Sequence, residues 1–209
     1  MASNIAVLGS TGSIGMQTLD VARNLGIKVS ALAANSNIEL LAKQAKEFRP
    51  LMVSVSDSSL AGELERSLRG TGIEVYSGAE GLKAAVSIGS VDTVVVSIVG
   101  IAGLVPTIEA IRRRKNVALA NKETLVTAGP IVMEEAERCG VTVFPVDSEH
   151  SAIYQCLAAN RKQDVERLIL TASGGPFRGR KLNELANVTV AQALKHPNWN
   201  MGSKITIDS

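Results

Sequence analysis

The chain has 209 residues, of which 45% are hydrophobic and 20% charged, a composition that is typical of a globular protein and excludes a disordered one. Its net charge of +2 is too small to indicate nucleic-acid binding, and the basic run at residues 112–115 falls where a helix is expected to end. No apolar segment reaches the ~18 residues that a membrane span needs. We therefore expect neither a nucleic-acid partner nor a membrane-embedded segment.

The N-terminus and the cysteines indicate the compartment. The first residues, MASNIAVLGS, enter a strand pattern at once and leave no room for a signal peptide. Cys139 and Cys156 fall in different predicted helices, without the spacing of a metal site. We expect a cytoplasmic protein with reduced thiols.

Short β-branched runs alternate with amphipathic helical segments along most of the chain. Strands are predicted at residues 5–8, 29–33, 52–55, 74–76, 93–97, 117–119 and 141–146. Helices are predicted at residues 14–25, 38–47, 59–69, 79–87, 105–113 and 125–139. This alternation predicts βαβ units with right-handed crossovers, and hence an α/β fold with a Rossmann-like, doubly wound parallel sheet.

The pattern changes after residue 146. One helix at residues 150–159 and an apolar strand at residues 165–171 are followed by a long polar stretch that contains glycine. We therefore expect a domain boundary near residue 147.

A glycine-rich loop follows the first predicted strand. In LGSTGSIGMQTLDVA, Gly9, Gly12 and Gly15 lead into a predicted helix with the pattern G-x-x-G-x-x-G. A phosphate can approach backbone N–H groups and a helix N-terminus only where side chains do not obstruct it. The position of the loop favours a dinucleotide phosphate site over a simple turn, although the spacing differs from G-x-G-x-x-G.

The end of the second predicted strand indicates which dinucleotide binds. NAD-specific sites usually carry Asp or Glu there, and a carboxylate would repel a 2′-phosphate. This chain has Asn35, Ser36 and Asn37, whose amides and hydroxyl can donate hydrogen bonds to phosphate. We expect NADP(H) rather than NAD(H). Ser36 and Asn37 can also cap the next helix, and the two roles are compatible.

Polar residues follow two later predicted strands. Asn121, Lys122 and Glu123 follow residues 117–119, at the strand end where open α/β sheets bind ligands, although a solvated Lys–Glu turn is the alternative. Asp147 and Glu149 follow residues 141–146. Residues two apart in an extended backbone point the same way, so both carboxylates could bind one Mg²⁺ or Mn²⁺ ion. The alternative is an N-cap and a first-turn Glu of the next helix.

Five motifs in this order resemble one enzyme family. GSTGSIG, ANKETLV, PVDSEH, SGGPF and HPNWNMGSKITIDS extend over residues 9–209. Together they resemble the 1-deoxy-D-xylulose 5-phosphate reductoisomerase family, which catalyses the NADPH-dependent second step of the methylerythritol phosphate route to isoprenoids.

The resemblance implies a role for each matching residue. NADPH would be bound by Thr11, Gly12, Ser13, Ile14, Asn35, Ser36, Asn37, Asn121, Glu123 and Gly202. The divalent metal would be bound by Asp147 and Glu149. The sugar-phosphate substrate would be bound by Lys122, Ser148, Glu149, Ser173, His196, Trp199 and Ser209. The catalytic residues would be Lys122, Glu149 and His196.

The resemblance also implies an organisation. Family members form homodimers and are roughly twice this length, with a third acidic metal ligand and further phosphate-binding residues. We therefore expect a fragment: a complete NADPH-binding domain, residues 1–147, and an incomplete α+β catalytic domain, residues 148–209, which carries a mobile loop. Such a fragment should bind NADPH and be inactive alone.

Other interpretations stay open. A different NADP-dependent dehydrogenase would need no divalent metal, and a regulatory nucleotide-binding module would perform no chemistry. Cys156 could serve as a thiol nucleophile, but its place on a predicted helix face favours core packing. His150 stands beside the expected metal ligands, where orientation or helix capping is favoured.

Overall fold

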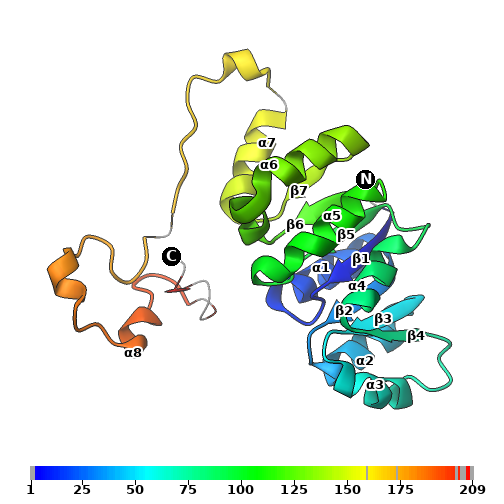
Figure 1. Ribbon diagram of the computed structural model, residues 1–209. Coiled ribbons are helices and arrows are strands. Elements are labelled where there is room, and N and C mark those ends of the chain that lie inside the picture. The colour runs from blue at the N-terminus through cyan, green and yellow to red at the C-terminus, as the bar shows by residue number, and fades with distance from the viewer. Residues whose placement is uncertain (1–2, 159, 173, 201, 203–205, 208–209) are drawn as a thin grey trace. The chain divides into compact units, whose positions relative to one another are not determined.

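The computed structural model describes residues 3–158, 160–172, 174–200, 202 and 206–207. The chain divides into two compact units, Met1–Tyr154 and Gln155–Ser209. Figure 1 shows the sheet and helices of the first unit and the short helical segments of the second.

The first unit is built on a seven-stranded sheet in which every neighbouring pair is parallel. Its strands are β1 (Asn4–Leu8), β2 (Lys28–Ala34), β3 (Met52–Val55), β4 (Glu74–Ser77), β5 (Thr93–Val96), β6 (Asn116–Leu119) and β7 (Val143–Pro145). Their spatial order is β4-β3-β2-β1-β5-β6-β7. The chain winds outward from β1 to β4, returns to pair β5 with β1, and continues outward to β7. The predicted doubly wound parallel sheet is confirmed.

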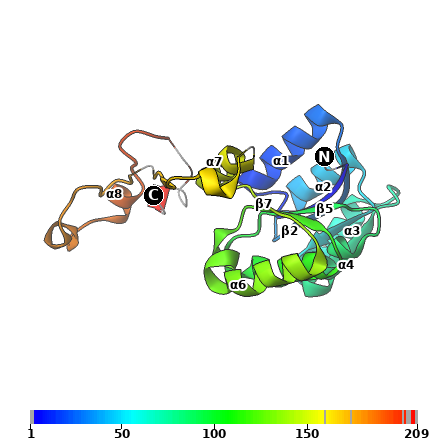
Figure 2. The same cartoon turned by 90° about the horizontal axis from the view of Figure 1, so that it is seen from above.

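Helices cover both faces of this sheet. They are α1 (Ser13–Leu25), α2 (Ile38–Phe48), α3 (Ala61–Ser67), α4 (Gly78–Ser87), α5 (Leu104–Arg112) and α6 (Lys122–Cys139), with 3-10 turns η1 (Ser58–Leu60) and η2 (Gly100–Gly103). A further helix, α7 (Ser148–Ala158), follows β7. Figure 2 shows α1 and α2 on one side of the strands and α4 and α6 on the other. Within the described residues, no helix is long and apolar enough to cross a membrane.

The alternation of side chains along the central strands explains the two layers. Ile5 and Val7 of β1 pack with Leu19 of α1, whereas Ala6 and Leu8 belong to the core that includes Ile111 of α5. Successive side chains of a strand point to opposite faces, so a strand that is apolar at every position must be covered on both. The sheet therefore divides the hydrophobic core into two layers.

The carboxyl ends of five strands lie side by side in register. Ala33 of β2 pairs with Leu8 of β1, and Leu8 pairs with Val96 of β5. Val96 pairs with Leu119 of β6, and Leu119 pairs with Pro145 of β7. Every loop that leaves these strands therefore starts from one edge of the sheet, which we call the carboxyl edge.

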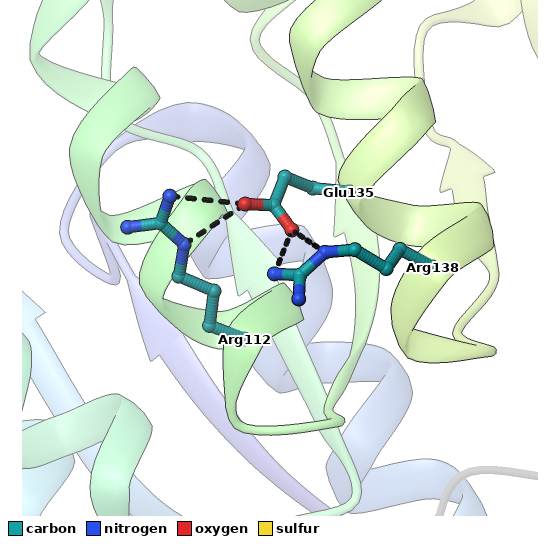
Figure 3. Close-up of polar contacts among 3 residues, drawn as sticks. All are labelled: Arg112, Glu135 and Arg138. Carbon is teal, nitrogen blue, oxygen red and sulfur yellow. Dashed lines mark hydrogen bonds and ion pairs between the residues drawn. The ribbon is translucent and has the colours of Figure 1, made fainter.

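An ionic network joins α5 to α6 near their C-terminal ends (Figure 3). Glu135 accepts hydrogen bonds from Nε and Nη2 of Arg112, at 3.1 and 2.9 Å, and from both corresponding nitrogens of Arg138. The hydrogen bonds from Arg138 and then Arg112 lower the pKa of Glu135. The Arg112–Glu135 pair links the two helices at the surface, while buried apolar side chains such as Ile111 and Val132 supply the packing beneath it.

The second unit differs from the sequence-based expectation. Its described residues form η3 (Lys162–Asp164), η4 (Leu182–Leu185) and α8 (Val190–Ala193), and no strand. The predicted strand at residues 165–171 is wrong: Leu168, Ile169 and Leu170 are exposed and lie in no regular element. An apolar run becomes a strand only where another strand pairs with it, and the described residues of this unit offer none.

Candidate functional site at the carboxyl edge of the sheet

The glycine-rich loop after β1 packs closely against the start of α1. A Cβ atom on Gly15 would lie 2.2 Å from the carbonyl oxygen of Gly9, so only glycine fits there. The N-cap residue of α1 is Gly12, which has no side chain to accept from the N–H groups of the first turn. Those N–H groups are left for a ligand, since a helix cannot satisfy its own first turn. Thr11 and Ile14 are half-buried beside the exposed Gly12 and Ser13.

The loop after β5 lies directly beside the loop after β1. Oγ of Ser97 donates hydrogen bonds to the carbonyl oxygens of Leu8 (2.8 Å) and Gly9 (3.2 Å). A Cβ atom on Gly9 would lie 2.7 Å from the carbonyl oxygen of Ser97. Since the chain order reverses between β1 and β5, this is the switch point at which doubly wound sheets bind ligands.

The polar residues after β2 lie at the same edge. Asn35, Ser36 and Asn37 are all exposed, and Oδ1 of Asn37 accepts a hydrogen bond from the backbone N–H of Leu40 (3.1 Å). Asn37 is thus the N-cap of α2, as the capping interpretation predicted. Asn35 and Ser36 are exposed. They lie next to the glycine-rich loop, because β2 pairs with β1.

Asn121, Lys122 and Glu123 follow β6, and they begin α6 rather than forming an isolated turn. Asn121 is 3% exposed and caps the helix, with Oδ1 accepting from the backbone N–H of Thr124 (2.8 Å). Its Nδ2 donates to the carbonyl oxygens of Ile98 and Gly100 in the loop after β5. Lys122 is exposed and makes no ion pair with the described residues, so its ammonium group is accessible at the edge.

Asp147 and Glu149 lie at the start of α7, next to the β6 loop. The backbone N–H of Ser151 donates to the carbonyl oxygen of Asp147 (2.8 Å), which closes the first helical turn. The expectation that both carboxylates follow an extended backbone is therefore wrong, and the helix-start alternative describes the local structure. Oγ of Ser148 donates to Glu149 at 3.3 Å, and Nδ1 of His150 lies 3.5 Å from Oδ1 of Asp147.

The carboxylate oxygens of Asp147 and Glu149 are ligands of the kind that a hard divalent cation prefers. Mg²⁺ is commonly held by one or two carboxylates, with substrate and water completing its shell. The described residues contain no group of three or more His, Cys, Asp or Glu side chains arranged to hold a metal.

Five predicted site residues lie in the second unit, and the structure describes three of them. His196 is buried, and its Nδ1 accepts hydrogen bonds from the backbone N–H groups of Asn198 (3.2 Å) and Trp199 (3.0 Å). The proton of the neutral ring therefore lies on Nε2, which is buried and has no partner in the described part of the chain. Trp199 is exposed, and the carbonyl oxygen of Gly202 accepts from Thr206. Ser173 and Ser209 lie outside the described residues.

The loop after β5 also belongs to this edge, although the sequence motifs did not predict it. Ser97 contacts the glycine-rich loop, and Ile98 and Gly100 are held by Asn121. The glycines of SIVGIAG, directly after a predicted strand, were the available signal. A separate hollow of about 550 Å³ lies at the amino ends of β3 and β4, beside Met52 and Glu74, and contains none of the predicted site residues.

The fold and this edge define a class. A doubly wound parallel sheet, with a glycine-rich loop at the switch point and an uncapped helix N-terminus behind it, is the architecture that Rossmann-like dinucleotide-binding domains share.

Comparisons with known proteins identify the family. Residues 5–129 match the family model "1-deoxy-D-xylulose 5-phosphate reductoisomerase", and residues 143–209 match the model of its C-terminal domain. The chain therefore belongs to the 1-deoxy-D-xylulose 5-phosphate reductoisomerase family.

Curated relatives agree with this assignment. The chain is 65% identical over 209 residues to a 1-deoxy-D-xylulose 5-phosphate reductoisomerase of Ruminiclostridium cellulolyticum, and 66% identical to one of Acetivibrio thermocellus. In both cases 100% of this chain covers 55% of the relative, so the chain spans about half the length of these proteins.

Solved structures show the same fold. The reductoisomerase of Zymomonas mobilis in complex with NADPH has a TM-score of 0.86 at 45% identity, covering 92% of this chain and 51% of that one. A reductoisomerase in complex with NADPH, fosmidomycin and magnesium has a TM-score of 0.87 at 40% identity, covering 99% and 54%.

Proposed function

We propose that the protein containing this chain converts 1-deoxy-D-xylulose 5-phosphate to 2-C-methyl-D-erythritol 4-phosphate, in isoprenoid precursor biosynthesis, with NADPH and Mg²⁺ or Mn²⁺. Identity of 65% over the whole chain to a named reductoisomerase supports the reaction. Solved relatives in complex with NADPH and with magnesium support the cofactors.

The observation that carries the proposal is the order of loops along the carboxyl edge. From β2 to β7 the edge carries, in this order, the polar residues 35–37, the glycine-rich loop and the loop after β5. Lys122 at the start of α6 and Asp147 just before α7 follow. Neighbouring strands are ~4.8 Å apart, so one extended dinucleotide can lie across several of them. We assign the 2′-phosphate to β2, the pyrophosphate to β1, and the substrate and metal to β6 and β7.

Each residue then has a defined task. NADPH supplies hydride, and the divalent cation supplies a Lewis acid that polarises substrate oxygens. Asp147 and Glu149 contribute anionic oxygens for the cation, and Ser148 contributes a hydroxyl for a substrate oxygen. Lys122 contributes a positive charge beside them, which favours oxygens that gain negative charge during the reaction.

The second unit contributes further groups in this proposal. His196 serves as a hydrogen-bond donor through Nε2, since Nδ1 is already an acceptor. Trp199 contributes an apolar cover that excludes water, and Gly202 lies near the cofactor. Ser173 and Ser209 bind the substrate phosphate. We also propose residues 1–147 as the NADPH-binding domain, residues 148–209 as part of the catalytic domain, a homodimer, and a cytoplasmic location.

The test is an assay of the protein that contains these residues. NADPH oxidation is followed with 1-deoxy-D-xylulose 5-phosphate, before and after removal of divalent metal and after its return. The proposal expects oxidation that requires both substrate and metal. Oxidation that survives thorough chelation would favour a metal-independent dehydrogenase, and NADPH binding without any turnover would favour a regulatory module.

A further inference from the structure

Asn121 has its whole side chain engaged within the protein. Its Nδ2 carries two hydrogens, and these go to the carbonyl oxygens of Ile98 and Gly100. Its Oδ1 accepts from the backbone N–H of Thr124 at 2.8 Å and from Oγ1 of Thr124 at 3.1 Å. An amide offers two donors and one acceptor oxygen with two lone pairs, so no capacity is left for a ligand.

The surroundings of this amide are closely packed. A Cβ atom on Gly103 would lie 2.8 Å from Nδ2 of Asn121, so η2 passes the amide at a distance that only glycine permits. Oγ1 of Thr107 in turn donates to the carbonyl oxygen of Gly103 at 2.7 Å. Asn121 therefore joins two segments: the connection from β5 to α5, which includes η2, and the first turn of α6.

The joined loop occupies a particular place along the carboxyl edge. β5 lies between β1, which carries the glycine-rich loop, and β6, which carries Lys122. If the pyrophosphate lies over β1 and the adenosine over β2, the nicotinamide half must extend over β5. Val99 and Ile101 of this loop are 66% and 56% exposed, and a reduced nicotinamide ring is uncharged with apolar faces.

We propose that Asn121, which the family resemblance implies as an NADPH-binding residue, acts instead as a positioning residue: its amide holds the loop of residues 98–101 in place as the apolar wall of the nicotinamide half of the NADPH site. This inference rests on the proposed NADPH site and adds a role to it. The Asn121 side chain is held rigidly, because breaking any of its hydrogen bonds would leave a buried polar group unpaired.

The experiment compares two nucleotides. Adenosine 2′,5′-bisphosphate carries the adenosine and the 2′-phosphate but no nicotinamide, so it reports on the β2 end alone. Asn121→Asp keeps the oxygen that caps α6 and removes both donors to the loop. We expect it to weaken NADPH binding about tenfold while the affinity for the bisphosphate stays unchanged, and to speed amide hydrogen exchange in residues 98–103.

A second pair of variants does not disturb the buried amide. Ile101→Ser should weaken NADPH binding several-fold and leave bisphosphate binding unchanged. Ile131→Ser is the matched control, because Ile131 is 57% exposed on α6 and Ile101 is 56% exposed. It should change neither affinity.

The outcomes separate the inference from the proposed function. Unchanged NADPH binding in both Asn121→Asp and Ile101→Ser would overturn the inference. An equal loss of affinity for NADPH and for the bisphosphate would also overturn it. If the unaltered protein bound neither NADPH nor the bisphosphate, the NADPH site itself would be wrong.

Discussion

Gly9 and Ser97 are in such close contact that their two loops form one unit at the switch point of the sheet. Oγ of Ser97 donates to the carbonyl oxygen of Gly9 at 3.2 Å, and a Cβ atom on Gly9 would lie 2.7 Å from the carbonyl oxygen of Ser97. Gly9 also has φ +90°, a conformation that side chains rarely adopt. The shape of the phosphate loop thus depends on glycine at this position.

We therefore expect Gly9→Ala to destabilise the fold by about 2–4 kcal/mol, since backbone strain and a steric clash act together. Gly70→Ala is the matched control, because Gly70 has φ +81° and open space around it. It should destabilise by only about 1–2 kcal/mol. Urea denaturation measures both, and equal losses of stability would show that the contact with Ser97 is unimportant.

Asp147→Asn tests the metal assignment. Loss of one anionic ligand should weaken Mn²⁺ binding at least ~10-fold, while NADPH affinity changes little because the glycine-rich loop belongs to another strand end. Mn²⁺ binding is measured by electron paramagnetic resonance. Asp20→Asn, on the exposed face of α1, should leave Mn²⁺ binding unchanged. If Asp147→Asn bound Mn²⁺ as the unaltered protein does, the ligand assignment would be wrong.

Ser36→Asp tests the assignment of the 2′-phosphate to the end of β2. An exposed carboxylate ~4 Å from a phosphate is repelled by about 1 kcal/mol per charge pair in water-like surroundings. The ratio of NADPH to NADH affinity should fall by about 5–10-fold. Ser36→Asn, which adds no charge, should retain the ratio. A ratio that Ser36→Asp left unaltered would place the 2′-phosphate elsewhere.

Asp92 gives a pH-dependent contribution to stability at the opposite edge of the sheet. Burial raises its pKa, but hydrogen bonds from Ser3, Thr93 and the backbone N–H of Asn4 outweigh this and hold the pKa below its ordinary value. A carboxylate with a lowered pKa stabilises the fold above its unfolded pKa of ~3.9, and this contribution is lost as the pH falls through the folded pKa.

The corresponding variant is Asp92→Ala. The substitution should lower the free energy of unfolding by about 1–2 kcal/mol at neutral pH, a figure that already allows for the partial exposure of Asp92. The difference in stability from the unaltered protein should shrink below about pH 4. Thermal denaturation over a pH series measures it. A difference that was constant down to strongly acidic pH would contradict the role of the charged form.

Strand–helix alternation was enough to predict the sheet, because β1, β2 and β5 are apolar at almost every position and can only be central strands. The order of the strands was not predicted, because the pattern along the chain does not reveal which strands pair. The first turn of α7 was harder, since the spacing of Asp147 and Glu149 is the same in a strand and a helix start. The helix that begins at Ser148, and the hydrogen bond from the Ser151 N–H to the Asp147 carbonyl oxygen, distinguish the two.

Non-local contacts were not predictable from local patterns. Asn121 was identified as a polar residue after a strand, but its bonds to Ile98 and Gly100 join residues more than 20 positions apart. The apolar run at residues 165–171 shows the converse error. β-branched and leucine residues predict a strand, yet pairing requires a partner that sequence does not reveal.

The most direct test of the central claim is a titration of the 209-residue chain with NADPH and, separately, with NADH, followed by nicotinamide fluorescence. The arrangement of the carboxyl edge predicts saturable binding of one NADPH per chain, with NADH bound about tenfold more weakly, a difference of about 1.4 kcal/mol. No saturable binding of NADPH, or equal binding of the two nucleotides, would contradict the assignment of this edge to NADPH.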